Sequence, residues 1–328
     1  PQHAQQQGRA VRSERGTELV SPPRSEASWI HYLTTRWKPE GAAVGPGDDA
    51  CVLPAGKYAL TTDTLVEHVD FERLWAPPEA LGHKALASNL SDLAAMGARP
   101  LCCLLTLGIP GDCPDSFVEG LLAGLRALAE SEGVGLAGGD LSASPSALFL
   151  TLALVGLQEN PPMLRSGGRP GDAIYVAGPL GGPACALARL QAGERLAAFR
   201  ADRPPADPGQ ALLDRFYRPP GQAALGSWLA SRGAASACMD VSDGLQRDLA
   251  RLCAASGCGA EIGADAVPLE PLIPDARRED LLTLCLQGGE EQLLLFAVPP
   301  ARERDLAAGR EDGRDLLPLQ SVGGHHGG

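Results

Sequence analysis

Eight acidic residues of this chain stand beside glycines or at the ends of expected helices and strands. They are Asp48, Asp49, Asp63, Asp92, Asp140, Asp240, Asp243 and Glu290. Each one alone is more commonly a turn residue or a helix cap. If several of them converge, their mutual repulsion raises their pKa values unless cations neutralise them. Because no histidine cluster accompanies them, these oxygen ligands favour Mg²⁺, which usually bridges to substrate phosphates.

Competing chemistries lack their motifs in this sequence. It contains no G-x-x-x-x-G-K-[ST], no protein-kinase loops, no H-E-x-x-H and no G-x-S-x-G. The only lysines are Lys38, Lys57 and Lys84, so a site that relies on a loop lysine is nearly excluded. A phosphoryl-transfer site made of metal ions and backbone glycines needs no such lysine, because the ions compensate the charge.

A helix expected over Gly82 to Arg99 positions one of these carboxylates. Its apolar residues follow helical spacing and face a core, whereas a polar stripe lies on the neighbouring face. The stripe consists of Lys84, Ser88 and Asp92, with Asn89 beside it. Polar groups this deep in a packed helix need partners. Asp92 as a structural bridge and Asp92 as a functional group are equally open here, and Lys84 has no role beyond a possible counter-charge.

Strands and helices alternate along the first half of the chain. The segment Tyr58 to Phe71 predicts a strand with Thr61 and Asp63 on one face and Thr62 on the other. The order strand, helix, strand, helix, strand, strand predicts an α+β domain that closes near Asn160. Val134 to Ala137 is expected to lead into Gly138-Gly139-Asp140.

A chain of 328 residues predicts two domains. We expect a disordered extension over residues 1–24, an N-terminal domain over 25–160 that binds ATP and Mg²⁺ and dimerises, and a C-terminal domain over 161–328 that completes the site. The formal net charge of -12 argues against nucleic acid and anionic membranes as partners. Nine cysteines without C-x-x-C pairs, short apolar runs and the lack of a leader predict a cytoplasmic location.

An ordered set of motifs carries a resemblance to a known family. The motifs are GPGDDACVL at 45–53, TTDTLVEHVDF at 61–71, KALASNLSDLAAMGARP at 84–100, GGD at 138–140, LRSGGRPGDAIYVAG at 164–178, MDVSDGLQRDL at 239–249 and QGGEEQLLLFAVP at 287–299. Together they resemble bacterial thiamine-monophosphate kinase, of the aminoimidazole ribonucleotide synthetase-like superfamily. The match runs from about residue 25 to about residue 325.

The resemblance implies a fold and an activity. It implies an α+β N-terminal domain that forms a homodimer across a β-barrel, followed by a C-terminal α/β domain. The implied reaction is ATP-dependent phosphorylation of thiamine phosphate to thiamine diphosphate, by direct in-line transfer with several Mg²⁺. Another ATP-dependent synthetase or ligase of the superfamily, and a nucleotide-binding relative without transfer activity, remain the alternatives.

The resemblance also implies roles for individual residues. The implied metal ligands are Asp49, Thr61, Thr62, Asp63, Asp92, Asp140, Asp240 and Asp243. ATP is expected at Gly139, Asp140, Arg165 and Ser242, and the substrate at Asp70 and Glu290. The implied catalytic residues are Arg165, Asp92 and Asp243, with the Arg165 guanidinium suited to bind the transferring phosphoryl group in a bidentate manner.

Three departures from the family pattern concern the thiamine side of the site. Asp70 precedes Phe71 where the family commonly has His. Glu291 and Gln292 stand in GGEEQLL where the family typically reads GGEDYEL. The family's last segment, which contributes an aromatic near the substrate, has no match after Gly323.

Overall fold

The computed structural model describes residues 58–273, 278–304 and 306, the backbone of 317–319, and the helical positions 28, 32, 35 and 36. The predictions for residues 1–24 and for Asp48 and Asp49 lie outside the described residues. Among the described helices, none is long and apolar enough to cross a membrane.

The first half of the described chain forms a four-stranded sheet, here called the N-terminal sheet. Its strands are β1 (Tyr58–Val66), β2 (Arg99–Pro110), β3 (Gly135–Ser144) and β4 (Phe149–Leu157), in the order β1-β4-β2-β3. Strand β4 is antiparallel to β1 and β2, whereas β3 runs parallel to β2. With the helices α2 (Pro78–Ala95) and α3 (Asp115–Glu132), the element order agrees with the predicted one.

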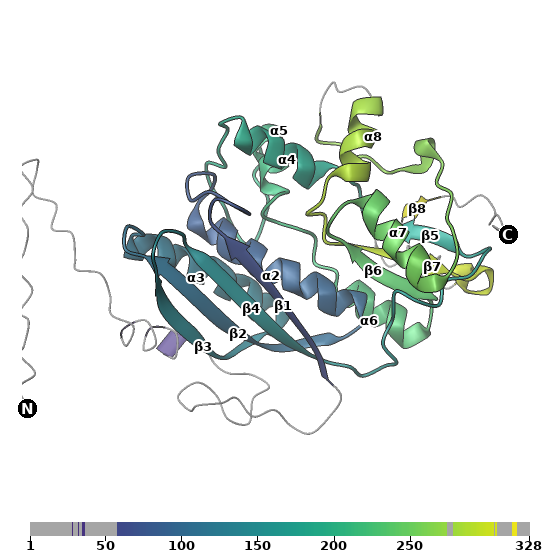
Figure 1. The fold of residues 1–328 in the computed structure, drawn as a ribbon, viewed down its shortest axis with the longest axis horizontal. Helices are drawn as coiled ribbons and strands as arrows, with labels where there is room; N and C mark the ends of the chain where they lie inside the picture. The colour runs from purple at the N-terminus through teal and green to yellow at the C-terminus, as the bar shows by residue number, and fades with distance from the viewer. Residues whose placement is uncertain are drawn as a thin grey trace, which may run out of the picture.

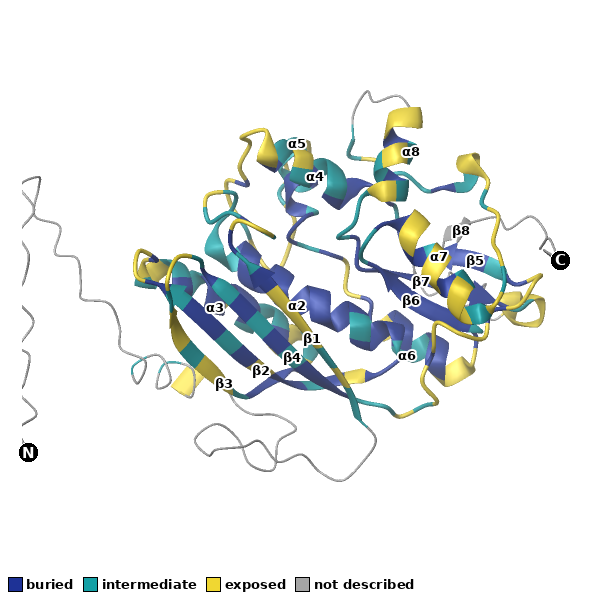
Figure 2. Cartoon of the chain, viewed as in Figure 1, coloured by how far each residue is buried: buried dark blue, intermediate teal, exposed yellow. Residues whose placement is uncertain are grey.

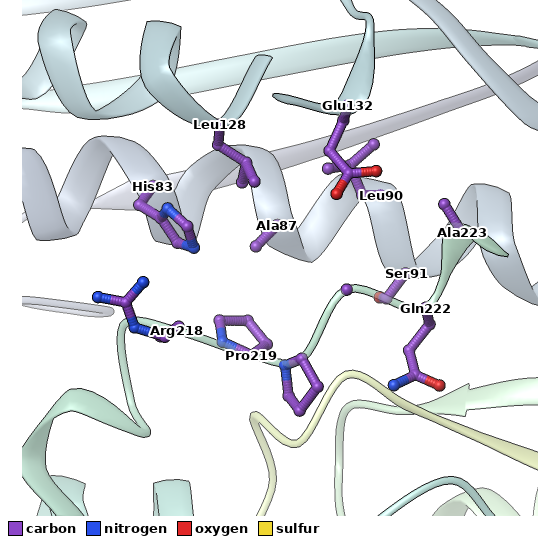
Figure 3. A pocket seen from close by; sticks show the side chains of 12 residues that line it. His83, Ala87, Leu90, Ser91, Leu128, Glu132, Arg218, Pro219, Gln222 and Ala223 are labelled. Atoms are coloured by element: carbon purple, nitrogen blue, oxygen red, sulfur yellow. The ribbon is translucent and has the colours of Figure 1, made fainter. Parts of the chain in front are cut away.

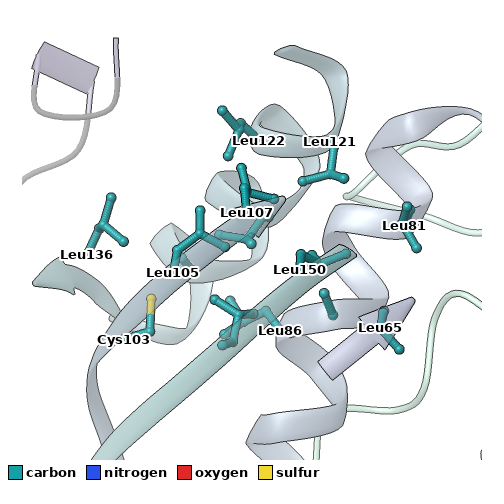
Figure 4. Close-up of a cluster of buried hydrophobic side chains, with 14 of the residues drawn as sticks. Leu65, Leu81, Leu86, Cys103, Leu105, Leu107, Leu121, Leu122, Leu136 and Leu150 are labelled. Atoms are coloured by element: carbon teal, nitrogen blue, oxygen red, sulfur yellow. The ribbon is translucent and has the colours of Figure 1, made fainter. Parts of the chain in front are cut away.

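Helices α2 and α3 cover one face of the N-terminal sheet (Figure 1). A core of leucines fills the space between the helices and the strands, with Leu86 of α2, Leu121 of α3 and Leu107 of β2 all 0% exposed (Figure 4). Leu65 of β1 belongs to this core. Because successive strand residues alternate between faces, Thr61 and Asp63 lie on the same face as Leu65, and Thr62 lies on the other.

The opposite face of the N-terminal sheet carries no helix in the described part of the chain (Figure 1). Leu60 of β1 is 75% exposed and Leu104 of β2 is 40% exposed on this open face. The register places Thr64 opposite Thr151, Thr151 opposite Thr106 and Thr106 opposite Asp140. Paired residues share a face, so Asp140 lies on the open face at the edge farthest from β1.

The second half of the chain forms another four-stranded sheet, here called the C-terminal sheet. Its strands are β5 (Ala173–Val176), β6 (Ala237–Val241), β7 (Leu293–Val298) and β8 (Leu317–Leu319), in the order β6-β7-β5-β8, and all described pairings are antiparallel. The helical elements around it are α4 (Gly182–Gln191), α5 (Pro208–Asp214), α6 (Ala223–Arg232), α7 (Leu245–Ser256), α8 (Arg278–Gln287), η1 (Ala264–Ala266) and η2 (Pro300–Arg302).

The C-terminal sheet is covered on both faces. Every residue of β6 and β7 is buried (Figure 2). Along β7, Leu294 and Phe296 pack into one core cluster, whereas Leu293 and Leu295 pack into another. Alternate residues of a strand point to opposite faces, so these two clusters lie on the two sides of the sheet.

Helix α2 packs against both sheets. It contacts β1 and β4 of the N-terminal sheet and β6 and β7 of the C-terminal sheet. Its last turn supplies Ala94 and Ala95 to a core cluster of the C-terminal sheet. The polar stripe of α2 is therefore held between the two halves of the chain.

Candidate active site

Three carboxylates converge where α2 meets the two sheets. Asp63 comes from β1, Asp92 from α2 and Asp240 from β6. Burial raises the pKa of Asp92. The pKa values of Asp63 and Asp240 are raised first by burial and then by the negative charge of Asp92. Asp92 is therefore close enough to Asp63 and to Asp240 for its charge to repel each of theirs.

Hydroxyl groups orient two of these carboxylates. Thr61 Oγ1 donates a hydrogen bond of 2.6 Å to Asp92 Oδ2, and Ser91 Oγ donates one of 2.6 Å to Asp240 Oδ2. Asp240 is only 5% exposed. Burial raises its pKa to about 6, although the bond from Ser91 opposes this shift. A cation that approaches Asp240 would favour its ionised form and lower this pKa.

Arg165 supplies positive charge beside the carboxylates. Its charge lowers the pKa values of both Asp92 and Asp240. Its side chain is exposed, so a ligand can reach the guanidinium. The structure therefore brings Arg165 together with two of the acidic residues that the sequence analysis placed in the site.

Lys84 and Glu290 form an ion pair on the same side of α2. Lys84 is 0% exposed, and its Nζ lies 2.5 Å from Glu290 Oε2 and 3.0 Å from the carbonyl oxygen of Phe216. The ammonium group also lies 3.8 Å from the centre of the Phe216 ring. The positive charge of Lys84 lowers the pKa of Glu290. Lys84 is thus the counter-charge of Glu290. The backbone of Glu290 lies in the left-handed region, with a φ of 71°.

The loop after β6 is held by a buried carboxylate. Asp248 is 0% exposed, and its Oδ2 accepts hydrogen bonds of 3.0 Å and 2.9 Å from the backbone amides of Ser242 and Asp243. Arg251 bridges Asp248 and Asp243. The amide of Glu290 donates to the carbonyl of Ser242 over 2.8 Å. These contacts bring Ser242, Asp243 and Glu290 into one loop cluster.

The Gly138-Gly139-Asp140 segment lies inside β3, which continues to Ser144 after a register shift between Cys103 and Leu104. A Cβ atom on Gly139 would lie 1.8 Å from the carbonyl oxygen of Leu105, so close strand packing accounts for this glycine. Three inter-strand spacings separate β3 from β1, about 14 Å. Asp140 and Gly139 are therefore not brought next to Asp63 within one chain.

Two other predicted residues lie apart from the carboxylates. Thr62 is on the open face, opposite to Thr61 and Asp63. Asp70 lies in the turn after β1, where its Oδ2 accepts a hydrogen bond of 2.8 Å from the amide of Val66. Asp49 lies outside the described residues.

Two positioning residues were missed by the sequence analysis. Ser91, and not Ser88, links α2 to Asp240, since Ser88 Oγ donates to the carbonyl of Lys84 in its own helix. Asn89 likewise donates to the carbonyl of Ala85. Asp248 was quoted only as part of a motif. An acidic residue in the first turn of a helix, directly after a loop that carries predicted site residues, could have indicated its role.

The donor set fits hard divalent cations. Asp63, Asp92 and Asp240 offer only oxygen atoms as ligands. A bound cation would relieve the repulsion between Asp92 and the other two carboxylates, which favours cation binding. Among the described residues, the only trio of acidic or imidazole ligand atoms within 4.8 Å of one another is Glu67, His68 and Glu72. The aspartates thus form no closed cage for one ion. Mg²⁺ binds in this open manner, through one or two carboxylates together with waters and phosphate oxygens.

The trio of Glu67, His68 and Glu72 has structural partners. Glu67 accepts a hydrogen bond from the Arg73 side chain and another from the amide of Leu148. His68 Nδ1 lies 2.9 Å from Glu72 Oε2. These bonds account for the trio without a metal ion.

Both halves of the chain match a known family of domains. The domain family described as AIR synthase related protein, N-terminal domain, matches residues 47–158, and its C-terminal counterpart matches residues 169–315. The chain thus has the two-domain architecture of AIR synthase related proteins, with helices and strands in both halves, as predicted.

The more similar relatives within this class are thiamine-monophosphate kinases. The enzyme of Salmonella typhimurium is 38% identical over 78% of this chain and 76% of its own length. The crystal structure of the enzyme of Stenotrophomonas maltophilia is 32% identical, covers 92% of this chain and 93% of its own, and has a TM-score of 0.78. A structure of AaThiL complexed with AMPPCP and TMP is 27% identical over 92% of this chain and 90% of its own, with a TM-score of 0.70. The chain belongs to the thiamine-monophosphate kinase family.

Proposed function

We propose that this chain transfers the γ-phosphoryl group of ATP to thiamine phosphate and forms thiamine diphosphate and ADP. The observation that carries the proposal is the convergence of Asp63, Asp92 and Asp240 from β1, α2 and β6. Family membership and the relative bound to AMPPCP, an ATP analogue, and TMP support it.

The acceptor needs no general base in this reaction. The second pKa of a phosphate monoester is about 6, so the acceptor oxygen is already ionised at neutral pH. That oxygen forms a bond to the γ-phosphorus while the bond from the γ-phosphorus to the β–γ bridging oxygen breaks, and ADP leaves with the electron pair. The difficulty is electrostatic, because two anions must meet in a protein with a net charge of -12.

Cationic groups compensate this charge. Arg165 lies where its charge acts on Asp92 and Asp240, and we assign its guanidinium to the transferring phosphoryl group. Asp63, Asp92, Asp240 and Asp243 would hold Mg²⁺ directly or through water. When bound, Mg²⁺ neutralises phosphate charge and aligns the reacting oxygens. Thr61 and Ser91 keep Asp92 and Asp240 in place through their hydroxyl groups.

The remaining contacts divide between the two substrates. Ser242 faces the nucleotide in this proposal, and Asp248 holds its loop. Glu290 approaches the thiamine moiety, with Lys84 fixing its carboxylate. The assignments of Asp49, Thr61 and Thr62 as metal ligands and of Asp70 as a substrate contact stay predictions.

A homodimer is part of the proposal. Leu60 and Leu104 expose apolar surface on the open face of the N-terminal sheet, which suits the same face of a second copy. Asp140 and Gly139 lie far from β1 within one chain, so their assignments to the metal ions and to ATP stay predictions. The division into domains at 25–160 and 161–328 is retained.

A reducing compartment suits the cysteines. The eight cysteines within the described residues are free thiols, and five of them are buried. Disulfides are rare in the cytoplasm, so a cytoplasmic location is proposed.

Product analysis tests the activity. Full-length protein with Mg²⁺, ATP and thiamine phosphate should release ADP and form thiamine diphosphate, whereas thiamine should give no product. ADP release with a carboxylate or amine acceptor alone would point to a synthetase or ligase of the superfamily. ATP binding without turnover of any phosphate acceptor would also overturn the proposal.

The variant Asp92→Asn tests the site. Loss of one carboxylate from the converging group should lower kcat at least about 100-fold while the fold survives. Asp202→Asn, at an exposed surface ion pair with Arg200, is the matched control and should keep its rate. Near-unchanged turnover of Asp92→Asn would remove Asp92 from the mechanism.

A further inference from the structure

A cavity of about 220 Å³ lies between α2, α3 and the segment 218–223 that leads into α6 (Figure 3). Leu90 of α2, Leu128 of α3 and Pro219 form its apolar walls. His83 and Arg218 lie at one end, and Glu132 and Gln222 lie at the other (Figure 3). A cavity of about 150 Å³ can hold benzene, so this one accommodates a ring with a short polar arm.

Two buried polar side chains that line the cavity have atoms without a hydrogen-bond partner among the described residues. His83 is 6% exposed and its Nδ1 has no partner there, and Gln222 is 7% exposed and its Oε1 has none. Buried polar atoms in native proteins nearly always have a partner. These atoms therefore indicate a polar ligand or water as part of the occupied state.

The charged groups are paired at one end of the cavity and unpaired at the other. Arg218 is compensated by Asp214, whose Oδ2 lies 2.6 Å from Arg218 Nε, and its other nitrogens donate to backbone carbonyls of the 200–203 segment. Glu132 has no ion pair among the described residues, and burial alone raises its pKa. The imidazole of His83 adds no charge at neutral pH, because burial and the charge of Arg218 lower its pKa to about 4. The uncompensated charge is thus the negative charge of Glu132.

We propose that this cavity binds a small organic monocation, with its ammonium group at Glu132 and the Gln222 side chain and its apolar body along Leu90, Leu128 and Pro219. His83 and Leu90 are seven residues apart on α2, which corresponds to about 10 Å along the helix. A ligand of one aromatic ring and a short amine arm fits this length. The ammonium group supplies the donors that a carboxylate and a carbonyl oxygen accept.

The cavity is separate from the proposed phosphoryl-transfer site. Its α2 residues, among them His83, Ala87 and Leu90, lie beside the face that carries Lys84 and Asp92. Ser91 is the shared boundary, since it lines the cavity and donates its hydroxyl to Asp240. Binding in the cavity does not depend on the proposed kinase activity.

Calorimetric titration of the full-length protein with benzylammonium at neutral pH tests the proposal. Binding should be saturable and should persist in the presence of saturating Mg-ATP and thiamine phosphate. Benzyl alcohol, which has the same shape without the charge, should bind at least about tenfold more weakly, the equivalent of one charge-assisted hydrogen bond.

Two variants separate the cavity from the rest of the surface. Glu132→Gln should weaken the affinity for benzylammonium by about tenfold or more and leave the affinity for benzyl alcohol unchanged. Glu130→Gln removes the same charge from the exposed side of α3, where Glu130 pairs with Arg126, and should leave the affinity unchanged. Ala87→Leu should block both ligands by filling the cavity.

Three results would overturn the proposal. These are the absence of saturable binding, equal affinity of the wild-type protein and Glu132→Gln, and displacement by thiamine phosphate or Mg-ATP. Circular dichroism of each variant establishes that it is folded. If Ala87→Leu does not fold, the comparison of Glu132→Gln with Glu130→Gln decides alone.

Discussion

The two sheets of this chain have the same number of strands in the described residues but differ in what covers them. The N-terminal sheet has helices on one face and exposed leucines on the other, whereas β6 and β7 of the C-terminal sheet are buried throughout. The strand sequences agree with this difference. β7 reads LLLFAV without interruption, while β1 reads YALTTDTLV with polar residues at its centre.

Within the described residues, the C-terminal sheet is packed on both faces and the N-terminal sheet on one. A sheet packed on both faces needs apolar residues at every position, and a sheet with one packed face needs them only at alternate positions. The open face of the N-terminal sheet is where we propose that a second copy binds. The carboxylates of the candidate site lie at the border between these two kinds of packing.

The largest expected effect lies within the C-terminal sheet. Phe296→Ala removes a fully buried ring from β7 and should lower the free energy of unfolding by about 3–5 kcal/mol. Leu74→Ala, at a site that is 80% exposed, is the control and should change it by less than about 0.5 kcal/mol. Urea unfolding followed by circular dichroism measures both. A small loss for Phe296→Ala would contradict the view that this sheet is closed on both faces.

A smaller effect concerns a carboxyl group that this closed packing has buried. Glu291 is 2% exposed, and its Oε1 accepts a hydrogen bond from the amide of Gly181. Burial, and then the charge of Glu270, raises the pKa of Glu291 to about 8, while the Gly181 amide and Arg215 oppose this shift. Cys285 also lies close to Glu291, whose negative charge adds to the effect of burial in raising the pKa of the Cys285 thiol.

The stability of the wild-type protein should therefore depend on pH through Glu291. The unfolded state loses this proton near the ordinary pKa of 4.5, whereas the folded state keeps it up to about pH 8. The folded state binds more protons in between, so the free energy of unfolding falls as pH rises across this range. Glu291→Gln keeps an acceptor for Gly181 and should be more stable than the wild type at pH 8 by of the order of 1 kcal/mol or more. Parallel pH profiles would contradict this.

The smallest effect on folding is expected on the open face. Leu60→Glu should leave the stability of a single chain within about 0.5 kcal/mol, because the side chain is already exposed there. It should nevertheless dissociate the proposed homodimer, since it places a charge in an apolar interface. Leu74→Glu is the matched control, and sedimentation velocity measures the outcome. A dimer that tolerates Leu60→Glu would place the interface elsewhere.

The sequence predicted the order of elements because apolar periodicity is a local property. It also predicted that Thr61 and Asp63 share a face, which follows from strand alternation alone. It did not indicate why residue 139 must be a glycine, because the close approach of Leu105 is a contact between strands. The choice of Ser91 over Ser88 as the partner of Asp240 depends on how α2 is rotated against β6, and no local pattern records that rotation.

The central position of α2 has a consequence for the synthesis of the chain. Lys84 and Glu290 are separated by 206 residues, and Ser91 and Asp240 by 149 residues. A ribosome completes α2 long before it reaches either acidic partner, so the nascent helix must keep its polar stripe in water or in transient contacts. A translation product that stops before residue 240 lacks both acceptors. In such an incomplete chain, the Lys84 ammonium and the Ser91 hydroxyl of α2 would lack their acidic partners.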